Sequence, residues 1–228
     1  MIEVEEITVA YGQMRAVRGV SLSLQAGDTL AVVGSNGAGK TTLLRAIAGQ
    51  LRLESGRILY KGEDITRLRA YQRARRGIAM VPEGRLLFPS LTVEENLLVG
   101  ASSKRKGVWT LDSVYELFPL VGERRRRRAG DMSGGERQAT AIARALMANP
   151  ELLLLDEVSL GLAPAIVSQM YAALPRIQAE GTAVLIVEQD VRQALAVSDA
   201  VHCLLQGQTS LEGRDLELAD ISRAYFGY

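Results

Sequence analysis

The 228-residue sequence has few of the features that mark exported, membrane-spanning or nucleic-acid-binding proteins. Its single cysteine, Cys203, excludes an internal disulfide framework and suits a reducing compartment. No apolar run approaches the roughly 18–20 residues that span a bilayer. The 27 Lys and Arg residues against 26 Asp and Glu leave a net charge of +1, so no overall field attracts nucleic acid. The acidic start, MIEVEEITVAYG, lacks the basic-then-apolar pattern of a signal peptide, and we expect a soluble cytoplasmic protein.

Short apolar strands alternate with amphipathic helices along the chain, a pattern typical of an α/β fold. The runs TLAVV at 29–33, LLLL at 152–155 and AVLIV at 183–187 are continuously apolar, as buried parallel strands are. From about residue 82 to 147 the pattern is mainly helical. We also expect strands at 2–9, 20–24, 57–60 and 77–81, and helices near 40–48 and 165–179. The sequence therefore predicts a parallel-sheet core with a helical segment inserted in its middle.

The segment GSNGAGKTT fits the phosphate-binding pattern G-x-x-x-x-G-K-[ST] and lies between a predicted strand and a predicted helix. Its glycines let backbone N–H groups face a β-phosphate, aided by the helix N-terminus. Lys40 would neutralise β- and γ-phosphate oxygens, and the Thr41 hydroxyl would ligate Mg²⁺. The alternative is a glycine-rich turn before a helix, but the residue order and context favour a nucleotide site. We predict that ATP is bound by Gly34, Ser35, Asn36, Gly37, Ala38, Gly39, Lys40, Thr41 and Thr42.

Two carboxylates follow the apolar run of LLLLDE at 152–157. A buried strand that ends in Asp156 places this carboxylate beside the phosphate loop, where it can hold Mg²⁺. Glu157 is placed to accept a proton from an attacking water. Such a pair alone is more often a plain loop feature, but together with the phosphate loop it predicts hydrolysis. A GTPase is disfavoured because the chain has no N-K-x-D segment.

The segment MSGGERQ, residues 132–138, looks like a second anion site far along the chain. Ser133 and Glu136 have the spacing of a helix capping box. Two glycines in a first helical turn lower helix stability, so a cap alone would not need Gly134 and Gly135. Either the glycines are incidental to a cap, or they allow a close approach of the backbone to a ligand.

Taken together, these motifs resemble the ATP-binding subunits of ABC transporters over essentially the whole chain. The resemblance implies one domain, residues 1–228, with a parallel-sheet core, an N-terminal antiparallel β part and a helical subdomain inserted at about 84–148. It also implies that Ser133, Gly134 and Gly135 clasp the γ-phosphate of ATP held by an opposite subunit. That subunit is a second copy of this chain or a homologous ATPase.

The resemblance assigns roles to further residues. It places Tyr11 where the family stacks an aromatic ring on adenine, although such a tyrosine alone is more often packed at a strand end. Residues 159–162, SLGL, correspond to the D-loop, which crosses the interface between subunits. Residues 81–85, VPEGR, correspond to the Q-loop, which faces the membrane partner.

Three departures from the usual family pattern sharpen the resemblance. Glu83 stands at the Q-loop glutamine, and we expect it to contact ATP and Mg²⁺. Gln189 stands at the switch histidine, and we expect it to act with Glu157 in catalysis. Both resemble the subfamily that serves branched-chain amino acid uptake (LivF-type), as do GRLLFPSLTVEENL, SLGLAP and the terminal AYFGY. Val158 replaces a proline that is usual even there, which removes a fixed φ angle beside Glu157.

Two features remain outside this scheme. His202, the only histidine, lies in AVHCLL and is expected to be structural, since no metal-ligand cluster or nucleophile surrounds it. The five arginines at 124–128 could bind nucleic acid or lipid headgroups, but the balanced charge of the chain favours a solvated turn.

The predicted function is that of an ATP-hydrolysing subunit of a bacterial importer of branched-chain or other hydrophobic amino acids. Its expected partners are permease subunits, a second ATPase subunit and, indirectly, a secreted substrate-binding protein. Its expected place is the cytoplasmic face of the cell membrane. Cargoes such as urea, amides or aromatic acids stay open, as does a soluble ABC ATPase of assembly or repair. A P-loop small-molecule kinase would leave SGGE and the D-loop segment without a use.

Overall fold

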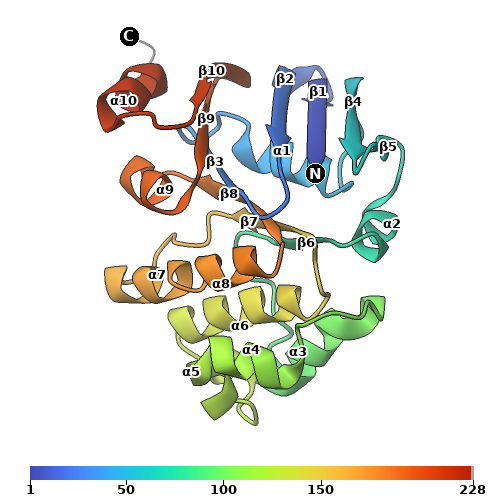
Figure 1. Cartoon of the computed structure of the whole chain (residues 1–228), viewed down its shortest axis with the longest axis vertical. Coiled ribbons are helices and arrows are strands. Elements are labelled where there is room, and N and C mark those ends of the chain that lie inside the picture. The colour runs from blue at the N-terminus through green and yellow to red at the C-terminus, as the bar shows by residue number, and fades with distance from the viewer. Residues whose placement is uncertain (227–228) are drawn as a thin grey trace.

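The computed structural model describes residues 1–226, which form two sheets and several groups of helices (Figure 1). The first sheet is antiparallel in the order β2-β1-β4-β5. Its strands are β1 (Ile2–Tyr11), β2 (Met14–Leu24), β4 (Ser55–Tyr60) and β5 (Glu63–Asp64). Along β1, Ile2, Val4, Ile7 and Val9 are buried, so one face of the sheet packs on the core. A register shift between Val4 and Ile7 keeps the apolar residues on this face.

The second sheet has the order β10-β9-β3-β8-β7-β6 and is parallel except for its edge strand β10. Its strands are β3 (Thr29–Val33), β6 (Ile78–Val81), β7 (Leu152–Asp156), β8 (Ala183–Glu188), β9 (Ala200–Leu205) and β10 (Gln208–Gly213). Every residue of β3, β7 and β8 is buried, which explains the apolar runs at 29–33, 152–155 and 183–187. The α/β fold class with its antiparallel N-terminal sheet is thereby confirmed.

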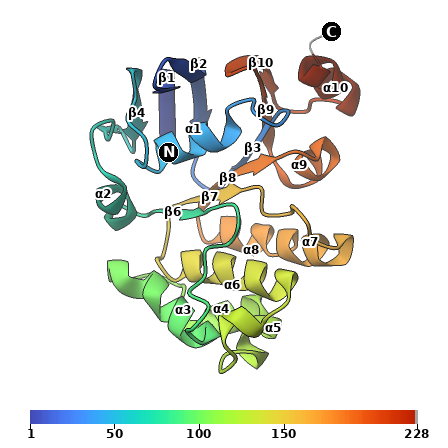
Figure 2. The ribbon, with the colours of Figure 1, turned by 180° about the vertical axis from the view of Figure 1, so that it is seen from behind.

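Two layers of side chains cover the parallel sheet. Alternate residues such as Leu152 and Leu154 pack with helix α1 and the antiparallel sheet, whereas Leu153 and Leu155 pack with helices on the other face. Figures 1 and 2 show α3–α6 gathered at the lower end, away from β1 and β2. These helices follow β6 and precede β7 in the chain. The helices are α1 (Lys40–Ile47), α2 (Ala70–Arg75), α3 (Val93–Gly100), α4 (Leu111–Leu117), α5 (Pro119–Glu123), α6 (Gly134–Leu146), α7 (Pro164–Tyr171), α8 (Leu174–Ala179), α9 (Val191–Val197) and α10 (Leu218–Phe226), with 3₁₀ turns at Ala101–Ser103 and Ala129–Asp131.

Several boundaries differ from the prediction. The single helix expected at 165–179 is two helices, α7 and α8, and Pro175 lies in the first turn of the second. Because proline has no N–H to donate, it cannot continue the ladder of α7. Strand β2 begins at Met14 rather than near residue 20. The terminal segment AYFGY ends with residues 227–228, which lie outside the described residues.

Candidate functional site

The phosphate-binding segment forms the connection between β3 and α1. Lys40 is the first residue of α1 and is only 4% exposed. Its Nζ donates to the carbonyl oxygens of Gly34 at 2.8 Å and Ser35 at 3.1 Å, so the ammonium folds back over the loop. The N-cap residue of α1, Gly39, offers no side-chain cap, and the first turn holds no acidic residue. The N–H groups at this helix end are therefore suited to an anionic ligand such as a phosphate.

The glycine at the N-cap is required by the fold itself. Gly39 has a φ of 102°, and a Cβ placed there would lie 2.4 Å from the carbonyl oxygen of Ala16. Gly37 has a φ of 80° but faces open space. The same loop thus contains one glycine fixed by close backbone contact and another whose surroundings leave room for a ligand.

Asp156 ends β7 and is completely buried. The Thr41 hydroxyl donates to its Oδ1 at 2.9 Å, whereas its Oδ2 has no hydrogen-bond partner. Burial raises the pKa of Asp156, and the nearby carboxylates of Glu157 and Glu83 add to this rise. A buried carboxylate oxygen without a partner beside a hydroxyl is a donor set that fits Mg²⁺.

Glu83 lies near this carboxylate but is exposed, and it makes no hydrogen bond or ion pair in the described part of the chain. Within residues 1–226, no group of three or more His, Cys, Asp and Glu side chains could hold a metal ion by itself. Any Mg²⁺ here would therefore take other ligands from phosphate oxygens and water, as this ion usually does.

Glu157, directly after β7, joins three segments of the site. Its Oε1 lies 3.4 Å from Lys40 Nζ, and its Oε2 accepts a hydrogen bond from Gln189 Nε2 at 2.5 Å. Lys40 follows β3 and Gln189 follows β8, and the strands β3, β8 and β7 are neighbours in the sheet. The carboxyl ends of parallel strands meet at one edge of a sheet, which is where open α/β folds bind ligands. The backbone of Glu157 has a φ of 47°, an uncommon conformation for this residue type.

Ser133 caps α6 as the sequence predicts. Its Oγ accepts from the Glu136 N–H at 3.2 Å, and Glu136 Oε2 accepts from the Ser133 N–H at 2.7 Å. A cap alone does not need Gly135, but its packing inside the chain gives this glycine a further use. A Cβ there would lie 2.8 Å from Ile166 Cγ2 on α7, so packing inside the chain already requires a glycine. At Gly134 an added Cβ would make only ordinary contacts.

Residues 85–86, at the end of the VPEGR segment and just after it, are attached to the same helix. Arg85 Nε donates to Gln138 Oε1 at 3.0 Å, and Arg144 NH1 donates to the Leu86 carbonyl at 2.8 Å. Arg85 and Leu86 both adopt positive φ angles, 68° and 42°. These contacts were not predicted, because nothing in a single arginine indicates which distant amide it meets.

Tyr11 lies at the other side of the phosphate loop, at the end of β1. Its side chain is 44% exposed, and its Oη lies 3.5 Å from Thr42 Oγ1 in the first turn of α1. The ring is thus free to contact a ligand bound at the loop.

The family model described as "ABC transporter" matches residues 17–159, which is more than half of the chain. The chain belongs to the ABC transporter family. As a member, it is an ATP-binding-cassette ATPase. It is 44% identical to the high-affinity branched-chain amino acid transport ATP-binding protein BraG of Pseudomonas aeruginosa, over 91% of this chain and 90% of that one.

Other ABC transporter proteins are similar at lower identity. The probable branched-chain amino acid transport ATP-binding protein LivF of Archaeoglobus fulgidus is 33% identical over 96% of this chain and 94% of its own length. The lipopolysaccharide export system ATP-binding protein LptB of Escherichia coli K12 is 33% identical over 98% and 95%. A crystal structure of an ABC transporter cassette in its ADP conformation has a TM-score of 0.85 and 28% identity, and covers 100% of this chain and 99% of that one.

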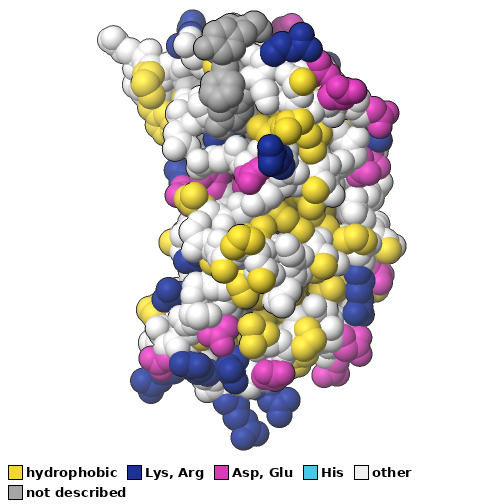
Figure 3. Space-filling view, turned by 90° about the vertical axis from the view of Figure 1, so that its left-hand side faces the viewer, with side chains coloured by type: hydrophobic (Ala, Val, Ile, Leu, Met, Phe, Trp, Pro, Cys, Tyr) yellow, Lys and Arg dark blue, Asp and Glu magenta, His cyan; other side chains and the backbone are white. Residues whose placement is uncertain are grey.

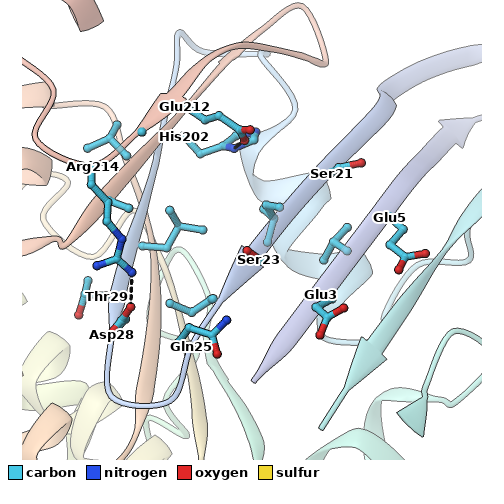
Figure 4. Close-up of a pocket in the computed structure, with 17 residues that line it drawn as sticks. Glu3, Glu5, Ser21, Ser23, Gln25, Asp28, Thr29, His202, Glu212 and Arg214 are labelled. Carbon is cyan, nitrogen blue, oxygen red and sulfur yellow. Dashed lines mark hydrogen bonds and ion pairs between the residues drawn. The ribbon is translucent and has the colours of Figure 1, made fainter. Parts of the chain in front are cut away.

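His202 lies away from this ABC ATPase site. It is 1% exposed in β9, with Nδ1 3.1 Å from Glu212 Oε2 and Nε2 3.0 Å from Thr209 Oγ1. Figure 4 shows it beside Glu212 at a groove of about 620 Å³ between the strands β1–β2 and β9–β10. None of residues 34–42 lines this groove. The position suits a structural histidine.

The arginine run makes local structural contacts. Arg124 Nε lies 3.0 Å from Glu136 Oε1 of the capping box, whereas Arg125–Arg128 are exposed. The carbonyls of Arg125 and Arg127 accept the first N–H groups of α3. Figure 3 shows Lys and Arg side chains gathered at the lower end, where α5 lies. None of the described helices has the length and apolar character that a bilayer crossing requires.

Proposed function

We propose that this ABC ATPase powers an importer of branched-chain or other hydrophobic amino acids. The observation that carries the proposal is the 44% identity, over 91% of the chain, to a relative named for branched-chain amino acid transport. A relative named for lipopolysaccharide export is 33% identical, so the higher identity favours amino-acid transport. The relatives are named as transport subunits, and no observation favours the soluble assembly or repair factor.

In the proposed reaction, Glu157 acts as the general base and accepts the proton of the attacking water. Lys40, now held by two loop carbonyls and near Glu157, turns toward the β- and γ-phosphate oxygens of ATP. Gln189 holds the Glu157 carboxylate and can donate its amide to a γ-phosphate oxygen. Thr41, Asp156 and Glu83 would hold Mg²⁺, which would neutralise part of the phosphate charge.

We further propose one domain over residues 1–228, with the helical subdomain inserted at about 84–148. In this arrangement Tyr11 stacks on adenine, and the phosphate loop of one chain binds ATP together with the signature segment of a partner, which in this chain is Ser133, Gly134 and Gly135. Ser133 is exposed and Gly134 is half-buried, and among the described residues no hydrogen bond or ion pair joins them to residues 34–42 of their own chain, which supports such a contact. The partner is a second copy or a homologous ATPase.

The permease would contact the surface around the Q-loop and α3, at the cytoplasmic face of the membrane. Four apolar residues are exposed there: Leu86 is 66% exposed, Phe88 48%, Leu98 51% and Val99 40%. Exposed apolar groups that lie close together often mark a protein interface. A secreted substrate-binding protein would act indirectly, through the permease.

The decisive test of the catalytic assignment is Glu157→Gln. The amide is nearly isosteric, so ATP binding should persist, but it cannot accept the proton of water. We expect steady-state ATP hydrolysis to fall about 10²–10⁴-fold, with nucleotide affinity retained. Hydrolysis at the wild-type rate in this variant would exclude Glu157 as the general base.

A mixing experiment tests whether the signature segment serves a partner's ATP. Two chains both carry Glu157→Gln, so that closed dimers accumulate; one adds Lys40→Ala and the other Ser133→Arg. A mixed dimer gathers both lesions into one site and leaves the second intact. We expect ATP-dependent pairing and one trapped nucleotide per dimer only after mixing. If the working complex is a heterodimer, the lesions are divided between the unlike subunits. If mixing restores neither pairing nor trapped nucleotide, in the homodimer or in the heterodimer, the shared site is contradicted.

A further inference from the structure

A buried carboxyl group, that of Glu188, lies beside the catalytic residues but has no part in the reaction as proposed. Glu188 is the last residue of β8 and is 2% exposed, at the end of the otherwise apolar run AVLIVE. Burying a carboxyl group without partners costs several kilocalories per mole, so its partners indicate what it does. It directly precedes Gln189 in the chain.

The partners of Glu188 come from two other segments. Its Oε2 accepts a hydrogen bond from the Ser159 hydroxyl at 2.7 Å, and its Oε1 accepts one from the Tyr171 hydroxyl of α7. Burial raises the pKa of Glu188, whereas the hydroxyl groups of Tyr171 and Ser159 oppose this rise. Both carboxyl oxygens therefore have partners inside the protein, Oε1 in Tyr171 and Oε2 in Ser159.

The last residue of β8 and the residue directly after it thus hold the two ends of one short turn. Gln189 binds the carboxylate of Glu157, and Glu188 binds the hydroxyl of Ser159. Between them, Val158 is 1% exposed and packs in the core. The Glu157 N–H also donates to the Val187 carbonyl at 3.0 Å, which ties the turn to β8 a third time.

This turn needs such support because its backbone is strained. Glu157 has a φ of 47°, which is unfavourable for a residue with a side chain, and persists only where surrounding contacts enforce it. Val158 leaves φ free where a proline would fix it. The hydrogen bond from Ser159 to Glu188 supplies a constraint one residue further along.

We propose that Glu188 is a positioning residue for ATP hydrolysis, which acts through Ser159 to hold the Glu157 turn so that the Glu157 carboxylate faces Lys40 and Gln189. This inference rests on the proposed function, in which Glu157 is the general base. Glu188 itself contacts neither nucleotide nor water in this scheme.

The first test compares Glu188→Leu with Glu188→Gln. Leucine fills a similar volume but accepts no hydrogen bond, so the turn relaxes; we expect kcat to fall about 10- to 100-fold, as small misplacements of catalytic groups do. The KM for ATP should change less than about 3-fold, because no group that binds ATP is lost. Glutamine keeps an acceptor for Ser159 and can donate to Tyr171, so it should restore kcat to within about 3-fold of wild type. All variants are assayed in the assembly in which wild type hydrolyses ATP.

The second test is a double-mutant cycle with Ser159→Ala, which removes the same contact from the other side. If Glu188 acts through Ser159, the double variant is about as slow as Glu188→Leu alone. If the losses of kcat in the two single variants multiply in the double variant, the proposal is overturned. If Glu188→Leu fails to fold, Ser159→Ala decides alone: a wild-type kcat in this variant overturns the proposal as well.

Thr182→Val is the matched structural control. It removes a buried hydrogen bond, 3.0 Å to the Pro150 carbonyl, immediately before the opposite end of β8. We expect Thr182→Val to have a lower Tm and an unchanged kcat. If it loses as much kcat as Glu188→Leu, general destabilisation explains the loss in Glu188→Leu.

A wild-type kcat in Glu188→Leu, with Glu157→Gln inactive, refutes this inference alone. An active Glu157→Gln refutes the proposed function instead.

Discussion

The buried arginine of α2 offers a quantitative test of how the helix that carries Lys40 is held. Arg73 is 1% exposed and pairs with no carboxylate among the described residues. Its guanidinium donates instead to the backbone carbonyls of Ala46 at 2.9 Å and Ile47 at 2.8 Å, at the C-terminus of α1. It also donates to those of Thr66 and Leu68, each at 3.0 Å. A cation at a helix C-terminus is favoured by the helix dipole.

The size of the effect follows from these four bonds. Hydrogen bonds from charged donors contribute about 1.5–3 kcal/mol each, so four contribute about 6–12 kcal/mol. Burying the cation offsets several kilocalories per mole of this gain. Burial lowers the pKa of Arg73 to about 10, so the group is still charged at neutral pH. For Arg73→Met we expect the free energy of unfolding to fall by about 3–5 kcal/mol.

Urea unfolding followed by circular dichroism measures this loss, and the m-value shows whether the unfolding reaction is unchanged. In thermal unfolding the same change lowers Tm by about 6–20 °C for a chain of this size. Arg75→Met, on the exposed face of the same helix, is the control and should lower the free energy of unfolding by less than about 1 kcal/mol. A loss below about 1 kcal/mol in Arg73→Met would refute the reasoning.

Three further predictions concern the site and the histidine. Gln189→Ala should slow ATP hydrolysis, whereas His202→Gln should leave it near normal; an inactive His202→Gln would show that the switch is misplaced. Burial lowers the pKa of His202, so the unfolded chain takes up the proton more readily, and stability should fall as pH drops below about 6.5. Urea midpoints measured between pH 7 and pH 5 should fall less in His202→Gln than in wild type. Gly39→Ala should abolish ATP binding, because its Cβ would collide with the Ala16 carbonyl. Gly37 faces open space, so Gly37→Ala should fold with only the strain of its positive φ. Calorimetric titration with ATP and thermal unfolding of both variants would show the difference.

The sequence predicts best those elements whose pattern comes from burial on both faces. TLAVV, LLLL and AVLIV are β3, β7 and β8, because core side chains cover both sides of these strands. In the structure Glu157 and Gln189 lie together because each directly follows the carboxyl end of a neighbouring parallel strand, whereas the sequence linked them only through the family resemblance. The roles of these residues stay predictions until the variants above are measured.

What the sequence does not predict depends on partners that are distant along the chain. Arg73 is one of several arginines in RLRAYQRARR, and only the position of α1 makes it buried. Glu188 could have been noticed as a lone carboxylate at the end of an apolar strand, but its partners Ser159 and Tyr171 could not. Strand β2 was predicted too short because register shifts against β1 break the period of two by which strands are found.

The order of strands in the parallel sheet has a consequence for the synthesis of this protein. Strand β3 lies between β8 and β9, and Thr29 pairs with Val184. Both neighbours leave the ribosome long after β3, so a nascent chain carries an apolar strand with two unpaired edges. Such edges are prone to aggregation, and a sheet of distant pairings folds slowly. The antiparallel sheet, by contrast, is complete once residue 64 has emerged. The phosphate loop is therefore among the first parts of the site to be made, and among the last to acquire its neighbours.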